Sequence, residues 1–196
     1  MSVEAFAADA PISSDERALL LPSLLSRAQL DEIERRRINA TRMWAMRVAV
    51  LKRGDLMTEA FARGLHRRMF GGIWRGAGRF RTTPHNPGWE PKHIATGVRM
   101  FLDDAEGWLR YSTYPVHEAA VRLHFRLAAV QPWFNGNGRH ARLIADIVVA
   151  ANEEKPLTWG LRSAQGGSGE TRARYLEAMR VAESGDVAPL LEFALS

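Results

Sequence analysis

The sequence contains no cysteine among its 196 residues. This absence excludes disulfide frameworks, thiolate nucleophiles and zinc sites built on cysteine. No apolar run approaches the roughly 18 residues that a membrane-spanning helix needs. Residues 1–9 include acidic Glu4 and Asp9 and lack the basic and apolar segments of a secretory signal. We therefore expect a cytoplasmic protein with no membrane span.

Lysine is also scarce. Of the 27 basic residues, only Lys52, Lys92 and Lys155 are lysine, and the rest are arginine, in a chain of net charge +5. The arginines are scattered along the chain, and residues 35–37 form the only run of three. A scattered excess of one basic residue type is more typical of a coding bias than of a nucleic-acid-binding surface, so a nucleic-acid partner is not expected.

What the sequence does contain is typical of a folded domain. Apolar residues make up 46% and charged residues 25% of the chain, close to the average of globular proteins. The length suits one compact domain with a short extension. We expect a loosely packed N-terminal arm over residues 1–25 and a single helical domain over residues 26–196.

Hydrophobic periodicity predicts a mainly helical, all-α fold. The stretch at residues 80–93 differs, because its three prolines and Gly88 oppose a helix and favour a loop or a small hairpin. The expected helices cover residues 26–51, a segment capped at Gly54 and Asp55 that ends at Gly71, residues 94–111, 116–130, 137–151 and 170–183, and a last short helix capped by Asp186.

The most informative stretch is residues 131–142, which reads Gln-Pro-Trp-Phe-Asn-Gly-Asn-Gly-Arg-His-Ala-Arg. Gly136 and Gly138 allow a positive φ and close approach of a ligand, and the amides that follow open a helix whose N-terminus attracts anions. Arg139 and Arg142 lie three residues apart and are expected to project toward the same anion. The stretch predicts a polyphosphate cradle, although a plain helix-to-helix turn with two solvated arginines has the same residues. Walker and dinucleotide-binding glycine patterns are absent.

This stretch resembles the Fic signature, His-Pro-Phe-x-Asp/Glu-Gly-Asn-Gly-Arg-x-x-Arg. The resemblance extends to residues 66–70, 74–81 and 169–172, and it is greatest to the Fic subgroup called mobile mystery protein B. The positions in register with the signature are Pro132, Gly136, Asn137, Gly138, Arg139 and Arg142.

The resemblance implies an all-α Fic-type domain with a short hairpin or loop flap at residues 80–93. Fic enzymes typically transfer AMP from ATP, with magnesium, to a hydroxyl group of a target protein, and the flap aligns the target segment by strand-like pairing. Related Fic proteins transfer UMP, phosphate or phosphocholine, so the donor stays open. The resemblance assigns phosphate binding to Gly136, Asn137 and Gly138, the β or γ phosphate to Arg139, the γ phosphate or an inhibitory glutamate to Arg142, and the metal to Asn135.

Trp133 replaces the usual phenylalanine of the signature with another aromatic residue, and two further departures matter for the chemistry. Gln131 stands where Fic enzymes have the catalytic histidine, and an amide cannot accept the proton that a general base removes. General-base catalysis typically contributes about 10²- to 10⁴-fold to the rate, so ordinary Fic turnover is expected to be impaired. Asn135 replaces the acidic metal ligand and keeps an oxygen ligand without its charge, so magnesium would depend more on the ATP phosphates.

Histidines elsewhere offer weak substitutes for the missing base. His140 follows Arg139 on the helix, where its direction differs from that of residue 131. His124 lies on the preceding helix and is expected to be a core residue. None of the six histidines shows the spacing of a zinc site, so no such site is expected.

Some Fic proteins are inhibited by a glutamate that pairs with the second motif arginine. Glu34 is the best positional candidate here, and it would then reach Arg142. The surrounding residues fit the inhibitory motif poorly, and the alternative is a solvated Glu34 paired with Arg37 on the same helix. The sequence thus predicts a Fic-type nucleotide-binding protein with impaired transfer, or alternatively an inactive nucleotide-binding pseudoenzyme or protein-interaction module.

Overall fold

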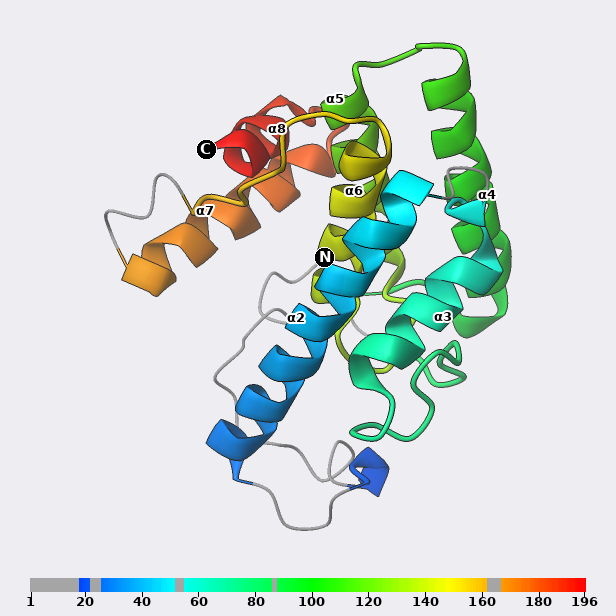
Figure 1. Ribbon diagram of the computed structural model, residues 1–196, viewed down its shortest axis with the longest axis vertical. Helices are drawn as coiled ribbons and strands as arrows, with labels where there is room; N and C mark the ends of the chain where they lie inside the picture. Colours follow the sequence, from blue (N-terminus) through cyan, green and yellow to red (C-terminus); the bar gives the residue numbers. More distant parts are fainter. Residues whose placement is uncertain (1–17, 22–25, 52–54, 86–87, 162–166) are drawn as a thin grey trace.

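The computed structural model describes residues 18–21, 26–51, 55–85, 88–161 and 167–196. These residues form an all-α fold without strands, as predicted (Figure 1). None of the helices among them is long and apolar enough to cross a membrane. The helices are α2 (Arg27–Leu51), α3 (Glu59–Phe70), α4 (Pro91–Arg110), α5 (Val116–Val130), α6 (Asn137–Ala151), α7 (Gly167–Ala182) and α8 (Ala188–Leu195).

Helix α6 lies at the centre of the fold. It packs against α5 and α2 and touches α3, while α4 covers the other side of α5, and α7 and α8 pack together beside α5 (Figure 1). Its apolar residues are buried nearly all round, which explains why this segment is apolar without a polar face. The motif that precedes α6 is therefore attached to the most firmly packed element of the domain.

The observed start of α4 corrects one expectation. The helix begins at Pro91 rather than at Ile94, so the last three residues of the expected flap are helical. Proline suits the first position of a helix, because the N–H that it lacks would have no partner inside the helix there. The helix α7 likewise begins at Gly167, three residues before the expected start.

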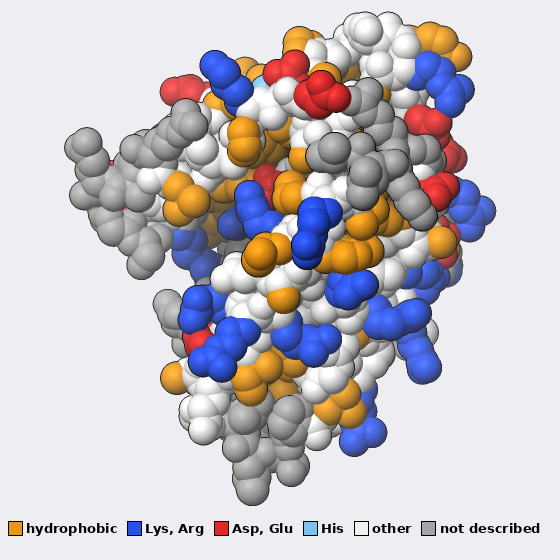
Figure 2. All heavy atoms as spheres, viewed as in Figure 1, with side chains coloured by type: hydrophobic (Ala, Val, Ile, Leu, Met, Phe, Trp, Pro, Cys, Tyr) orange, Lys and Arg blue, Asp and Glu red, His pale blue; other side chains and the backbone are white. Residues whose placement is uncertain are grey.

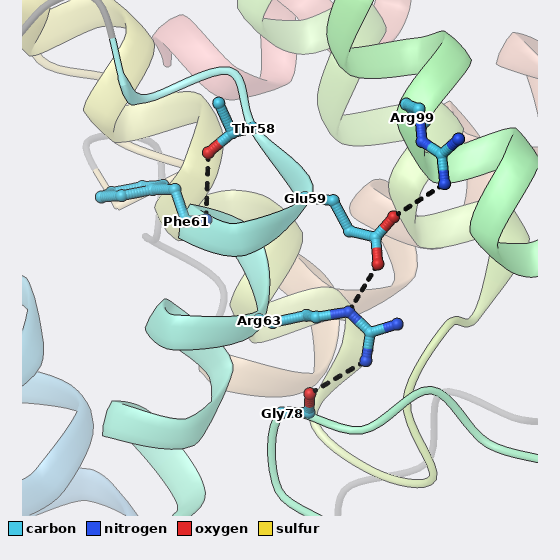
Figure 3. Close-up of polar contacts among 6 residues, drawn as sticks. All are labelled: Thr58, Glu59, Phe61, Arg63, Gly78 and Arg99. Carbon is cyan, nitrogen blue, oxygen red and sulfur yellow. Dashed lines mark hydrogen bonds and ion pairs between the residues drawn. The ribbon is translucent and has the colours of Figure 1, made fainter.

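The cap of α3 also differs from the expectation. Gly54 lies outside the described residues, and Asp55 belongs to the turn before the helix. Thr58 caps α3 instead, because its side-chain oxygen accepts a hydrogen bond of 3.1 Å from the amide of Phe61 (Figure 3). Asp186 was expected to cap α8, and its carboxylate does accept the Ala188 amide at 2.9 Å, although the residue at the cap position is Val187.

The described part of the expected N-terminal arm is packed rather than loose. Leu20 is buried and forms an isolated antiparallel bridge with Trp74. The amide of Leu21 donates to the carbonyl of Ile73 at 2.8 Å, and the amide of Arg75 donates to the carbonyl of Leu19 at 2.7 Å. The rest of the arm, residues 1–17 and 22–25, lies outside the described residues.

Candidate functional site

The motif is a turn between the C-terminus of α5 and the N-terminus of α6. Gly136 is the N-cap of α6 and has a φ of 76°, and a Cβ there would lie 2.4 Å from the ring of Phe70. Both the backbone and the space around it therefore require glycine. No side chain of the described residues caps this helix, so the amides of its first turn and the positive end of its dipole are available to an anion.

Asn137 shapes the turn from inside. Its side-chain oxygen accepts from the Trp133 amide and its side-chain nitrogen donates to the Trp133 carbonyl, both at 2.8 Å. The phosphate contact predicted for Asn137 is thus left to its main-chain amide. A Cβ at Gly138 would meet nothing within 4 Å, so the outer side of the turn is open.

His66 holds the turn from α3. Its Nδ1 accepts the Gly78 amide at 3.0 Å, so its Nε2 carries the hydrogen and donates to the Asn135 carbonyl at 3.0 Å. Burial lowers the pKa of His66 well below its ordinary value, and the neighbouring His140 adds to this effect. In the sequence, His66 stands out only through the family resemblance, and its spacing does not indicate this bridging role.

His140 and His124 are both core residues. The Nε2 of His140 donates to the Ala62 carbonyl at 2.9 Å, while its Nδ1 accepts from the indole of Trp133 at 3.2 Å, and burial lowers its pKa to about 4. With both nitrogens engaged inside the core, His140 is not placed to replace the missing base. His124 is buried, as expected, and burial lowers its pKa to about 3.

Arg81 clamps the start of the motif. Its Nε donates to the Gln131 carbonyl at 2.6 Å, and its Nη2 lies 3.3 Å from the Val130 carbonyl. The same guanidinium donates to the carbonyls of Thr83 at 2.8 Å and Trp89 at 2.5 Å. The side chain is buried, and burial lowers its pKa. The carbonyls at the negative end of α5 stabilise the positive charge that burial penalises.

The described residues of the flap lie against the same end of the motif. The Arg81 amide donates to the Pro132 carbonyl at 3.0 Å, and the Trp89 amide donates to the Val130 carbonyl at 3.1 Å. A Cβ at Gly88 would lie 2.7 Å from Arg81 Nη2, so glycine gives the clamp its room. Residues 80–85 and 88–90 contain no strand, so among the described residues the flap is a loop.

Gln131 is held in an unusual conformation by these contacts. It is the C-cap of α5, with φ 51° and ψ 60°, in the left-handed region that non-glycine residues rarely occupy. Its side chain is largely buried, with 8% of the residue surface exposed. Main-chain geometry therefore fixes the position at which the sequence resemblance predicts the catalytic base.

Glu34 reaches the motif from α2, and the expectation of a solvated glutamate was wrong. Glu34 is buried, and its carboxylate pairs with Arg139 at 2.5 Å and accepts from the Trp74 indole at 2.6 Å. Arg37, the alternative partner, instead lies against the carbonyl of Arg68. Glu34 is buried because α2 packs on α6, which places residue 34 on the inner face of α2. The sequence of α2 alone does not show which of its faces is covered.

The two motif arginines do not share a target, contrary to the expectation. Arg139 faces Glu34 and also donates to the Asn135 side-chain oxygen at 3.3 Å. Arg142 lies over the ring of Tyr175, with 4.4 Å from its guanidinium carbon to the ring centroid. Their partners lie on different helices, Tyr175 on α7 and Glu34 on α2, so the three-residue spacing does not bring the two arginines to one target. The partner of Glu34 is thus Arg139 and not Arg142.

A family model for Fic/DOC matches residues 56–149, which include α3, α4, α5 and α6 up to Val149. This segment carries the turn, the clamp and the histidine bridge described above. The matched segment is therefore similar to the Fic/DOC family. The helix with Glu34 precedes the matched segment.

Curated relatives of the Fic domain include protein adenylyltransferases. The chain is 28% identical over 134 residues to protein adenylyltransferase fic-1 of Caenorhabditis elegans, a match that covers 66% of this chain and 25% of the relative. It is 26% identical over 152 residues to protein adenylyltransferase Fic of Culex quinquefasciatus, covering 74% of this chain and 28% of the relative. The chain thus spans about a quarter of the length of these relatives.

Solved Fic structures share the fold. Fic-1 of C. elegans, residues 134–508, has a TM-score of 0.62 at 24% identity, and the match covers 89% of this chain and 55% of that one. The BepC protein of Bartonella tribocorum, solved with bound AMPPNP, has a TM-score of 0.59 at 15% identity and covers 89% of this chain and 88% of that one.

Proposed function

We propose that this protein binds a nucleotide at the N-terminus of α6 and is a Fic-type relative of the adenylyltransferases with impaired AMP transfer. The observation that carries the proposal is the uncapped first turn of α6 with Arg139 beside it. Anions bind at such helix ends because free amides and the helix dipole both point at them. The BepC structure holds an ATP analogue in the same fold, which supports the choice of ATP.

Magnesium is expected to arrive with the nucleotide. Asn135 offers an uncharged side-chain oxygen, which also accepts from Arg139. Among the described residues, no group of three or more histidine, cysteine, aspartate or glutamate side chains lies close enough to hold a metal. Hard cations such as magnesium bind phosphate oxygens well, so the nucleotide would supply most of the ligands.

Transfer requires a proton acceptor that Gln131 does not provide. In AMP transfer, the target hydroxyl oxygen forms a bond to the α phosphorus, the bond from this phosphorus to the β-phosphate oxygen breaks, and pyrophosphate leaves. The hydroxyl proton must pass to a base. Gln131 can hydrogen-bond and orient the hydroxyl, and the flap backbone beside it would align the target segment.

Glu34 is proposed to restrain nucleotide binding. Its carboxylate pairs with the guanidinium of Arg139, which is 39% exposed and lies in the first turn of α6. A phosphate group must replace Glu34 as the partner of Arg139, and this replacement leaves a buried carboxylate with only the Trp74 indole. The expected result is a lowered affinity for ATP in the protein as it stands.

Nucleotide binding can be tested by thermal unfolding with and without ATP and magnesium. The Arg139→Ala variant alone is ambiguous, because it also leaves buried Glu34 without its cation. The better pair is Glu34→Gln against Glu34→Gln with Arg139→Gln. We expect ATP to raise the Tm of the first variant and to leave the second unchanged. Equal rises in both, or none in either, would contradict the proposed site.

Catalysis can be tested with ATP labelled at the α phosphate. The protein and its Gln131→His variant are incubated separately with a mixture of Ser-, Thr- and Tyr-containing peptides. Label transferred only by the variant supports impaired transfer. Strong transfer by both would show that Gln131 does not impair the reaction. Binding without transfer by either would favour the alternative, an inactive nucleotide-binding module.

A further inference from the structure

His66 on α3 connects the turns that follow α3 to the motif. Its Nδ1 accepts the Gly78 amide and its Nε2 donates to the Asn135 carbonyl, both at 3.0 Å. The residue is 3% exposed, and its ring stacks on Trp133 with 4.4 Å between the ring centroids and 26° between the ring planes. A buried ring that is stacked and bonded through both nitrogens has little freedom to turn, so the direction of its Nε2 donor is fixed.

Gly78 is itself fixed against α3, which keeps the acceptor nitrogen of His66 occupied. Its φ of 79° and its close approach to α3, where a Cβ would lie 2.7 Å from the Arg63 carbonyl, both require glycine. The Gly78 carbonyl accepts from Nη1 of Arg63 at 3.4 Å (Figure 3). Because the Gly78 amide occupies Nδ1, the hydrogen of the neutral ring stays on Nε2, the nitrogen that faces Asn135.

The bond from His66 sets the orientation of the peptide unit that joins Asn135 to Gly136. A trans peptide holds its C=O and its N–H on opposite sides. Since the Asn135 carbonyl points inward to His66, the Gly136 amide of the same unit points away from His66. Within the described residues, nothing accepts a hydrogen bond from the Gly136 amide. This amide is therefore directed so that it can donate to an anion at the start of α6.

The need for such a bond arises from the glycine at position 136. Phe70 leaves no room for a side chain there, because a Cβ would lie 2.4 Å from its ring. Glycine populates positive and negative φ about equally, so the peptide unit before Gly136 can rotate at little steric cost. The hydrogen bond from His66 selects the one orientation in which the amide faces away from α3.

Positive charge alone would not orient a phosphate group. Lys and Arg side chains are spread over the face of the molecule shown in Figure 2. A field from many spread charges attracts anions without fixing their orientation, whereas a backbone amide donates along one direction. The orientation of a phosphate beside Arg139 thus depends on how the amides of the turn point.

We propose that His66 is a positioning residue of the phosphate site, which holds the Asn135 carbonyl inward so that the Gly136 amide donates to a bound phosphate group. This role rests on the proposed binding of a nucleotide at the N-terminus of α6. His66 does not touch the phosphate itself, because its two ring nitrogens are occupied by the Gly78 amide and the Asn135 carbonyl.

Two substitutions at position 66 separate this role from packing. His66→Asn places an amide group near the position of Nδ1, so the side chain can accept from Gly78 and cannot reach Asn135. His66→Gln places an amide group near the position of Nε2, so the side chain can donate to Asn135 and loses the bond to Gly78. Both variants lose the ring that stacks on Trp133, so they are matched for the loss of packing.

ATP binding with magnesium is measured by isothermal titration in the Glu34→Gln background, at a temperature at which circular dichroism shows both variants folded. His66→Gln should bind ATP within about twofold of the background. His66→Asn should bind about tenfold more weakly, because one hydrogen bond to a charged phosphate is lost. Equal affinities in the two variants, or weaker binding in His66→Gln than in His66→Asn, would overturn the role of His66.

A measurement without any change at position 66 tests the same point and decides it if His66→Asn does not fold. In isotope-labelled Glu34→Gln protein, ATP should shift the Gly136 amide proton resonance downfield, because the amide gains a hydrogen bond to a phosphate oxygen. A Gly136 resonance that stays in place while ATP binds would overturn the proposal. Absence of ATP binding in this background would instead overturn the proposed function, and the role of His66 would fall with it.

Discussion

The two ends of the motif are held in opposite ways. At its start, Gln131 is fixed by main-chain hydrogen bonds from Arg81, a buried side chain that contacts four carbonyl groups. At its end, Arg139 is held mainly by one ion pair to Glu34, and its guanidinium is partly exposed. The position proposed for the chemistry is therefore rigidly held, while the arginine proposed to bind phosphate has a partner that a ligand could replace.

The largest effect on stability is expected when the guanidinium of Arg81, which holds the start of the motif, is removed. Arg81→Met removes the donor to four carbonyls, of which that of Val130 keeps the Trp89 amide, and we expect the free energy of unfolding to fall by about 3–5 kcal/mol. Urea denaturation measures the change. Arg79→Met, at an exposed neighbouring position, should change stability by less than about 0.5 kcal/mol. A similar small effect at Arg81 would mean that the start of the motif is not rigidly held.

The buried histidines of α5 and α6, His124 and His140, should make the fold sensitive to acid. Burial depresses the pKa of His140 to about 4 and that of His124 to about 3, below the ordinary 6.5. The unfolded chain then binds more protons than the folded one below pH 6.5, so stability is full above this pH and falls as the pH drops. Each histidine should cost about 2 kcal/mol at pH 5.

Denaturation at pH 7 and pH 5 measures this loss. The exposed His93→Gln variant is the control and should lose as much stability as the unaltered protein. The His124→Phe variant should lose about 2 kcal/mol less on acidification. Stability independent of pH over this range would contradict the buried, neutral state of both histidines.

Releasing Arg139 from Glu34, at the other end of the motif, should have an effect of intermediate size, seen in the affinity for ATP. Glu34→Gln removes the charge that holds Arg139, so ATP affinity should rise about tenfold, which corresponds to about 1.4 kcal/mol. Isothermal titration measures it. Glu32→Gln, two residues earlier on α2 and paired only with surface arginines, should leave the affinity unchanged. Weaker ATP binding in Glu34→Gln would show that Glu34 supports the site rather than restrains it.

The smallest effect is expected from the indole that holds Glu34. Trp74→Phe keeps the ring in the core and removes only the hydrogen bond to the carboxylate. The buried carboxylate that a phosphate displaces from Arg139 would then have no partner, so ATP affinity should fall about threefold, a smaller change than in Glu34→Gln. Trp44→Phe is the matched control on α2. An effect larger than that of Glu34→Gln would contradict an action through Glu34.

Local patterns predicted most of the fold. The apolar periodicity of α2, α5 and α6 placed these helices to within a residue, and the Gly136 turn was expected at the correct place. The errors concern the exact residues at which helices begin. Several neighbouring residues could cap α3 or start α4, and the structure uses Thr58 as the cap and Pro91 as the first helical residue. Capping and first-turn proline are local, so these signals were present in the sequence and were read incorrectly.

The contacts that define the site were harder to predict. Glu34 and Arg139 are 105 residues apart, and Arg81 and Gln131 are 50 apart, so no spacing rule within one helix relates them. Arg142 was misplaced because the direction of a side chain depends on which neighbouring helix covers it. Such pairings follow from tertiary packing, and the residues of α2 or of the flap alone do not indicate them.

The left-handed backbone at position 131 limits which residues can stand there. Valine, isoleucine and threonine would clash with that φ and ψ, whereas histidine, like asparagine, occurs in this region more often than most side chains. A change from the amide to an imidazole would thus need no rearrangement of the chain. The backbone at this position suits histidine as well as glutamine, so a single substitution separates the present residue from one able to accept a proton.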